Sequence, residues 1–311
     1  MKIIDSHSHI GKDNAWDIQG NLKEYVKKAK EIGITESLIM PVPMPKIGIG
    51  NSEVTPIMLA TYGEENYIVT GVEDQYGLRP NLVSNNPYKY VNERLYRNIK
   101  NIADIKLHFI PLVNAIFDTP EYLERIIDKY HPIAFKIHGY SSIISPREIK
   151  DDFWNIIKKY DIPLIIHTDC DINENDSSLD WYYRNENAPL IWIRILDKNR
   201  IKGYLTHGVR LCDKSFEIVN NNPNFVVGLG PDALLSSCKD RMYSEEKYLE
   251  TLFDKLEIDK ICFDIDYPWN VSAYDSKTLD WNSIERIKKL KLSKEELEKV
   301  LSKNSQSFFK I

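Results

Sequence analysis

The first ten residues, MKIIDSHSHI, place two histidines two positions apart, with an aspartate two positions before them. Side chains two positions apart on a strand point to the same face, so His7 and His9 are expected to project together. Two neutral imidazoles on one face form half of a site for zinc or a similar divalent ion. Asp5 is expected to share that face and to orient one of the two histidines.

Polar residues that could complete the site follow other apolar runs. His167 ends PLIIHT, His207 ends YLTHG, and Asp266 lies near the end of KICFDIDYP. In each case a polar group follows a buried strand, where burial without a partner would be costly. Asp264 is an alternative to Asp266, because it precedes it by two residues on the same face. The sequence therefore predicts a second half-site built from several strand ends.

Lys136 and His138 share a face in FKIHG. A lysine inside a barrel needs an anion. It could pair with a carboxylate, contact the substrate, or be carboxylated to bridge two metal ions, and an ordinary salt bridge is as well supported as any of these. The remaining histidines, His108 and His131, are interpreted as structural or surface residues.

Short apolar runs alternate with helix-like segments along the whole chain. Eight runs have the length of strands buried on both faces, at 2–10, 35–43, 106–115, 133–140, 163–169, 201–208, 224–232 and 260–268. The segments between them have helical periodicity, as in GNLKEYVKKAKEIG, which ends at Gly33. Eight strand–helix repeats predict a (β/α)₈ TIM barrel. A doubly wound open sheet is the alternative, but no glycine-rich phosphate loop follows the first strand.

Two connections are longer than the others. Residues 44–104 follow the second strand and residues 170–200 follow the fifth, so both long excursions are expected at the C-terminal mouth of the barrel. YVNERLYRNIKNI within the first excursion is expected to be a helix. We expect residues 1–311 to form a single domain.

Composition excludes several classes of protein. The net charge is −5 with no basic stripe, so no nucleic-acid partner is expected. No apolar run is long enough to span a membrane, and no signal peptide precedes the first strand. The four cysteines are widely separated and form no CxxC pair. These features favour a cytoplasmic protein that acts on a small molecule.

The ordered set DSHSHI, FKIHG, IIHT, THG, FDIDYP and VLSKNSQSFFKI resembles the amidohydrolase superfamily. The resemblance is strongest to the amidohydrolase-related (amidohydro_2) branch, which includes aminocarboxymuconate-semialdehyde decarboxylase-like enzymes and dicarboxylate lactone hydrolases. It extends along residues 3–311. Asp264-Ile265-Asp266-Tyr267-Pro268 departs from the Gly-Ser-Asp-x-Pro ending that is common in this branch, so Asp264 is an additional acidic group that could supply a second metal contact.

The resemblance implies roles for individual residues. His7, His9, His167 and Asp266 would bind one divalent ion, with zinc favoured over manganese or another metal, and a second ion would be less favoured. His207 would polarise the substrate, and Asp266 would also handle the proton of a metal-bound water. The expected activity is attack of a metal-bound hydroxide on a small carbonyl compound such as an amide, a lactone or a related carboxylate.

Further residues are expected to contact the substrate, and several activities remain open. Arg210 could bind a substrate carboxylate, and Tyr140 and Trp269 could shape the pocket. The alternatives are decarboxylation of an unsaturated carboxylic acid on the same metal site, a TatD-like nuclease, and a metal-binding barrel without turnover. A nuclease of the TatD type would need an acidic ligand where Lys136 and His138 stand. Relatives are often homodimers or larger oligomers, and by this analogy alone a homodimer or higher oligomer is one of the open alternatives.

Overall fold

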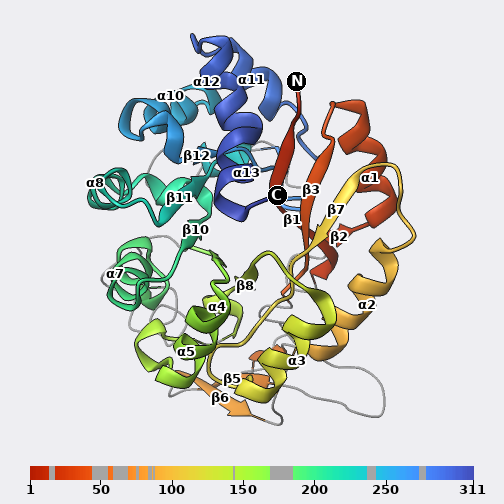
Figure 1. The fold of residues 1–311 in the computed structure, drawn as a ribbon, viewed down its shortest axis with the longest axis vertical. Helices are drawn as coiled ribbons and strands as arrows, with labels where there is room; N and C mark the ends of the chain where they lie inside the picture. The colour runs from red at the N-terminus through yellow and green to blue at the C-terminus, as the bar shows by residue number, and fades with distance from the viewer. Residues whose placement is uncertain are drawn as a thin grey trace.

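A computed structural model describes residues 1–13, 18–43, 55–58, 69–74, 77–82, 86, 88–142, 144–168, 185–236, 243–272 and 278–311. Eight parallel strands make up the centre of the molecule (Figure 1). They are β1 (Ile4–Asp13), β3 (Glu36–Pro41), β7 (Lys106–Phe109), β8 (Phe135–Ile137), β9 (Leu164–Ile166), β10 (Gly203–Leu205), β11 (Phe225–Gly228) and β12 (Ile261–Cys262). Each of the eight predicted runs coincides with one of these strands, although β1 continues three residues past its run, so the predicted order of the barrel strands is confirmed.

The eight strands form two sheets that are joined at both seams. One sheet has the order β2-β1-β3-β7, where β2 (Ile18–Gly20) pairs antiparallel with β1, and the other has the order β12-β11-β10-β9-β8. A parallel bridge between Leu112 and Lys136 joins β7 to β8. At the other seam the Ser6 N–H donates to the Phe263 carbonyl at 3.1 Å. The fold is therefore the predicted (β/α)₈ barrel, with its strand ladder interrupted at two places.

Helices follow the strands and cover the outside of the barrel (Figure 1). The long ones are α1 (Leu22–Glu31), α2 (Lys89–Ile99), α3 (Pro120–Tyr130), α5 (Asp151–Tyr160), α7 (Pro189–Asn199), α8 (Asp213–Asn221) and α10 (Glu245–Lys255). In α1 the apolar stripe Tyr25, Val26 and Ala29 is buried against the strands, and Gly33 follows the helix with φ +88°. The large apolar core lies in this layer between strands and helices.

The last part of the chain closes the N-terminal end of the barrel. A second apolar cluster contains residues from all eight strand segments or their flanks together with Phe309. Phe309 belongs to α13 (Asn304–Phe309), and its ring lies 5.6 Å from that of Tyr204. α13 follows α12 (Lys294–Glu298) and η4 (Lys299–Lys303), and a capping box of Ser293 and Glu296 begins α12. This plug leaves the other end of the barrel for polar side chains.

The shorter elements lie mainly in the loops. They are α4 (Gly139–Ser142), η1 (Pro146–Glu148), η2 (His207–Leu211), α9 (Asp232–Ser236), η3 (Ile258–Lys260) and α11 (Ser283–Lys289). The excursion after β3 contains a three-stranded antiparallel sheet of β4 (Thr55–Met58), β5 (Val69–Asp74) and β6 (Gly77–Leu82), followed by α2, which confirms the predicted helix. Of the second excursion, residues 169–184 lie outside the described residues, and α7 occupies the rest.

Within the described residues, no helix is long and apolar enough to cross a membrane.

Candidate metal centre

β1 places His7 and His9 beside each other, as their spacing predicts, and it also contains an irregularity that the sequence pattern did not indicate. The register between β1 and β3 shifts between Asp5 and Ser8. His7 and His9 point toward each other across 3.0 Å between their Nε2 atoms. Asp5 instead accepts hydrogen bonds from the Tyr25 and Ser8 hydroxyls, each at 2.5 Å. The expectation that Asp5 shares a face with the histidines was wrong, because a bulge changes the alternation of side chains.

Asp5 still supports the site, but through the backbone. Its Oδ1 accepts from the backbone N–H of His7 at 3.2 Å and from that of Ile265 at 3.0 Å. These two N–H groups belong to the first strand and to the segment after the last one. Asp5 therefore ties together the two segments that carry His7 and Asp266.

A backbone carbonyl fixes the orientation of His9. The Nδ1 atom of His9 lies 2.8 Å from the carbonyl oxygen of Pro41, which can only accept. Nδ1 must therefore carry the proton, and Nε2 of the neutral ring presents a lone pair toward His7. A second partner of this kind is typical of a metal-binding histidine, because it fixes the tautomer.

Asp266 completes a compact group of three ligand atoms. Its Oδ1 lies 3.3 Å from His7 Nδ1 and 3.7 Å from His9 Nε2. One ligand atom from each of His7, His9 and Asp266 lies within 4.8 Å of the others, and all three residues are buried. Within the described part of the chain, His7 Nδ1 and Asp266 Oδ1 have no hydrogen-bond partner. Buried polar atoms without partners are costly, and a cation held between them would remove that cost.

Asp264 is held away from this group by hydrogen bonds of its own. The Tyr204 hydroxyl donates to its Oδ2 at 2.6 Å, and the Gly230 N–H donates to its Oδ1. Its Oδ2 lies 4.0 Å from His7 Nδ1. Both carboxylate oxygens of Asp264 thus already accept hydrogen bonds, which favours a role in supporting the site over direct contact with a metal ion. The sequence reasoning missed Tyr204, which is one residue of an apolar strand run and gave no separate signal.

Lys136 and a second cluster of histidines lie beside the first group. Lys136 Nζ lies 2.8 Å from His7 Nε2. His207 Nε2 lies 3.1 Å from His167 Nδ1, and His138 stacks on His167 with ring centroids 3.7 Å apart. His207 Nδ1 is 3.9 Å from Asp266 Oδ2, which links the two groups. The structure thus brings five predicted histidines, Lys136 and both acids into one region. His167 lies beside His207 and His138 and is not part of the group of His7, His9 and Asp266.

The residues around His207 have a rare backbone conformation. Residues 207–211 all have positive φ, between 44° and 61°, and four of the five are not glycine. Such a conformation costs energy in L-residues and is typical of functional sites. The turn presents His207 and Arg210 together, and Arg210 Nε donates to the Thr168 carbonyl at 2.9 Å, directly after His167.

Of the two aromatic residues predicted to shape the pocket, Trp269 lies at the site. Trp269 packs edge-on against His9 with ring centroids 5.0 Å apart. The side chain of Tyr140 lies outside the described part of the structure, so its role stays a prediction.

Burial controls the ionisation of these groups. It lowers the pKa of all five histidines, His7, His9, His138, His167 and His207, well below the usual range. Burial also lowers the pKa of Lys136 to about 7, although Asp266 and Asp264 oppose the shift. Neutral imidazoles are the form that binds metal.

The two acids respond in the opposite direction. Burial raises the pKa of Asp266 well above its usual range, and the nearby charge of Lys136 opposes this shift. Burial likewise raises the pKa of Asp264, against the hydrogen bond from Tyr204. Perturbed carboxyl groups in such a cluster are typical of active sites.

The sequence profile of the amidohydrolase family (Amidohydro_2) matches residues 105–311, and no curated protein sequence matches the chain.

Several solved structures share the fold at low sequence identity. The probable 2-pyrone-4,6-dicarboxylic acid hydrolase of Acinetobacter baumannii is 12% identical, with a TM-score of 0.60 over 100% of both chains. The 5-carboxyvanillate decarboxylase of Sphingomonas paucimobilis is 10% identical, with a TM-score of 0.62 over 100% of this chain and 99% of that one. The β-aspartyl dipeptidase of Fervidobacterium islandicum is 15% identical, with a TM-score of 0.55 over 100% of this chain and 75% of that one.

These structures show the shared barrel, and the profile identifies the family. Because the profile covers about two thirds of the chain, the protein belongs to the amidohydrolase family and is an enzyme.

Proposed function

We propose that the protein is a metal-dependent hydrolase that acts on a small carbonyl compound, such as an amide, a lactone or a related carboxylate. The observation that carries this proposal is the buried group of His7, His9 and Asp266, which holds two polar atoms without partners. These residues fit a divalent ion, because they offer two neutral imidazoles and a carboxylate. Zinc is favoured, and manganese is the alternative.

The chain's own residues prepare this site for hydrolysis. A divalent ion bound here would lower the pKa of water and polarise a carbonyl group. Pro41 holds the ring of His9 so that Nε2 faces the site. Asp266 has a raised pKa and directs one oxygen to the histidines and the other toward His207. It is suited to take up the proton of the attacking water.

His207 and Arg210 are proposed to hold the substrate. His207 Nδ1 is buried and has no hydrogen-bond partner among the described residues, so it can contact the substrate carbonyl oxygen. The charge of Arg210 acts on His138, His167, His207 and Asp266, which places its positive charge close to the reacting centre. A guanidinium there would bind a substrate carboxylate.

Decarboxylation of an unsaturated carboxylic acid is the second candidate. Lys136 and Arg210 provide two positive charges beside Asp266, which favours a substrate with a carboxylate near the metal. The similarity to both a hydrolase and a decarboxylase gives no preference between the two reactions. Incubation with a panel of amides, lactones and unsaturated carboxylic acids would separate them. Decarboxylation releases carbon dioxide, whereas hydrolysis adds water and gives an acid and an amine from an amide or one ring-opened hydroxy acid from a lactone.

The decisive experiment measures metal content by elemental mass spectrometry in gently purified protein. The H7A/H9A double variant is compared with wild type, and H131N is the control. His131 ends α3 with φ +46°, a conformation that asparagine tolerates, and it lies outside the site. We expect about one equivalent of zinc or manganese per chain in wild type and in H131N, and none in H7A/H9A.

Other outcomes of the same measurement discriminate the alternatives. About two equivalents would bring Lys136 or Asp264 into the ligand set. No metal and no uptake on addition would contradict the proposal. Metal without turnover of the panel would leave a nuclease of the TatD type, which cleavage of DNA tests.

A further inference from the structure

The residues of the metal group meet at the seam between β1 and the segment that follows β12, residues 263–267. Backbone hydrogen bonds cross this seam beside each of them. The Asp266 N–H donates to the His7 carbonyl at 2.8 Å, and the His9 N–H donates to the Tyr267 carbonyl at 2.6 Å. The relative positions of His7, His9 and Asp266 therefore depend on how firmly these two segments are joined.

Asp266 needs support from its neighbours because its backbone conformation is uncommon. Its φ is +58°, in the left-handed region that residues other than glycine seldom occupy. Such a conformation persists only where surrounding contacts hold it. The residues on either side of Asp266 are both held through their backbone N–H groups, Ile265 by the Asp5 carboxylate and Tyr267 by the Ser8 hydroxyl.

The hydroxyl of Ser8 joins the two segments directly. It donates to Asp5 Oδ2 at 2.5 Å and accepts from the Tyr267 N–H at 3.2 Å. A hydroxyl has one hydrogen and two lone pairs, so it can make both bonds at the same time. Ser8 is 0% exposed, so bulk water does not compete for either partner. One side chain thus connects the bulge of β1 to the residue that follows Asp266.

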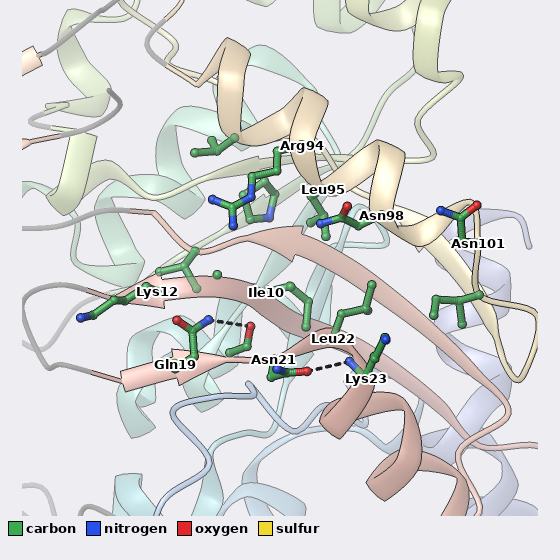
Figure 2. Close-up of a pocket in the computed structure, with 16 residues that line it drawn as sticks. Ile10, Lys12, Gln19, Asn21, Leu22, Lys23, Arg94, Leu95, Asn98 and Asn101 are labelled. Carbon is green, nitrogen blue, oxygen red and sulfur yellow. Dashed lines mark hydrogen bonds between the residues drawn. The ribbon is translucent and has the colours of Figure 1, made fainter. Parts of the chain in front are cut away.

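The side chain of Tyr267 is anchored on α1. Its hydroxyl accepts from the backbone N–H of Asn21 at 2.9 Å and donates to the Asn21 carbonyl at 3.3 Å. Asn21 caps α1 by accepting from the Lys23 N–H at 3.0 Å, as Figure 2 shows. Tyr267 is therefore fixed at its ring by the start of α1 and at its backbone by Ser8.

We propose that Ser8 is a positioning residue for the metal site: its hydroxyl holds the backbone next to Asp266 against β1 and so fixes the Asp266 carboxylate opposite His7 and His9. This inference rests on the proposed metal-dependent function. A carboxylate that is already in place loses little freedom when an ion binds, whereas a mobile one must first be ordered, which weakens binding. The hydroxyl of Ser8 therefore raises the affinity for the ion without being a ligand.

Titration of metal-free protein with Co²⁺ tests the proposal, with the visible absorption of the bound ion as the signal. The measurement gives a dissociation constant and does not depend on turnover or on a known substrate. We expect the dissociation constant to rise about 10–100-fold in S8A, as is typical when a group that orients a metal ligand is removed.

S6A is the control for the loss of a buried hydroxyl beside a metal ligand. Ser6 precedes His7, is 0% exposed like Ser8, and has its hydroxyl 2.6 Å from that of Ser305 in α13, away from the Asp266 segment. Urea denaturation of the metal-free protein should show a loss of stability in S6A similar to that in S8A. The dissociation constant of S6A is expected to stay within about threefold of wild type.

Y25F separates the two hydrogen bonds of Ser8. The Tyr25 hydroxyl donates to the same oxygen of Asp5 as Ser8 does, so Y25F removes a donor from Asp5 but leaves the Tyr267 N–H bonded to Ser8. We expect the dissociation constant of Y25F to change much less than that of S8A.

Three results would overturn the proposal. The first is a dissociation constant in S8A equal to that of wild type. The second is an equal rise in S8A and in either control, which would assign the effect to Asp5 or to a general loss of buried hydrogen bonds. The third is an S8A protein that does not fold, as judged by circular dichroism, because Ser8 would then serve the fold. Absence of Co²⁺ binding to wild type would instead contradict the proposed metal site, on which this inference rests.

Discussion

The two ends of the barrel each bury a carboxylate, and they treat it in opposite ways. Glu36 begins β3 at the N-terminal end and is 2% exposed, whereas Asp266 follows β12 at the mouth and is 3% exposed. Glu36 has ion pairs with Lys2, Lys106 and His108, and that with Lys106 is 2.6 Å long. Asp266 Oδ1 has no hydrogen-bond partner.

The pKa values of the two acids follow from these surroundings. Burial alone would raise the pKa of Glu36, but hydrogen bonds from Lys106, Lys2 and His108 lower it to about 2. Burial raises the pKa of Asp266, and no comparable set of donors compensates for it. Equal burial therefore gives a paired group that stabilises the fold at one end and an unsatisfied group suited to chemistry at the other.

The largest expected effect is a loss of activity without a loss of stability when Asp266 at the mouth of the barrel is replaced. D266N keeps the size of the side chain, and asparagine tolerates the φ of +58° at this position. We expect kcat/KM for the substrate found in the panel to fall by about 10²–10⁴-fold, because the group that carries the proton is lost. The free energy of unfolding of the metal-free protein is expected to change little, since the amide has no charge to bury.

D259N is the control for this variant, because Asp259 is exposed and pairs only at the surface with Lys299. Activity that survives in D266N, or a loss of stability as large as that expected for Glu36, would remove the contrast between the two ends.

The second effect concerns the opposite end. E36A leaves Lys106, Lys2 and His108 without their shared partner, and we expect a loss of about 1–3 kcal/mol in the free energy of unfolding, because the two lysines are exposed enough to be hydrated. Urea denaturation measures this loss. E285A is the control, because Glu285 forms only an exposed pair with Lys288, worth about 0.5 kcal/mol. Normal metal content in folded E36A would show that this network serves stability alone.

A loss of stability from a single hydrogen bond is expected when the bond from Tyr204 to Asp264 is removed. Y204F removes the hydroxyl that donates to Asp264 Oδ2 at 2.6 Å inside the barrel. We expect a loss of about 1–3 kcal/mol in the free energy of unfolding, because a buried carboxylate oxygen loses its partner. Metal content is expected to stay at the wild-type level. A loss of metal in Y204F would instead mean that Asp264 takes part in binding the ion.

The most gradual effect is the dependence of stability on pH. The pKa of Glu36 is about 2 in the folded protein and 4.5 in its ordinary state. A lowered pKa stabilises the fold above the unfolded value, so the contribution is complete above about pH 4.5 and is lost as the pH falls toward 2. The difference in unfolding free energy between wild type and E36Q should therefore shrink over this interval. A constant difference from pH 6 to pH 3 would contradict the assigned pairing.

The sequence allowed much of the fold to be predicted, because the signals are local and repeated. The eight apolar runs each contain a strand, and the helical stripe of Tyr25, Val26 and Ala29 is buried as expected. The topology rule that strand ends of a parallel barrel meet at one mouth was enough to bring His7, His207 and Asp266 together. Residue type and order along the chain thus determined the fold class and the location of the site.

Only the tertiary structure decided how these groups are used. The bulge in β1 turns Asp5 away from the histidines, Tyr204 occupies Asp264, and the carbonyl of Pro41 sets the tautomer of His9. Each of these outcomes depends on contacts between residues distant in sequence or on a one-residue shift in register. Periodicity contains neither kind of information, because it describes which face a residue lies on and not which partner it meets there.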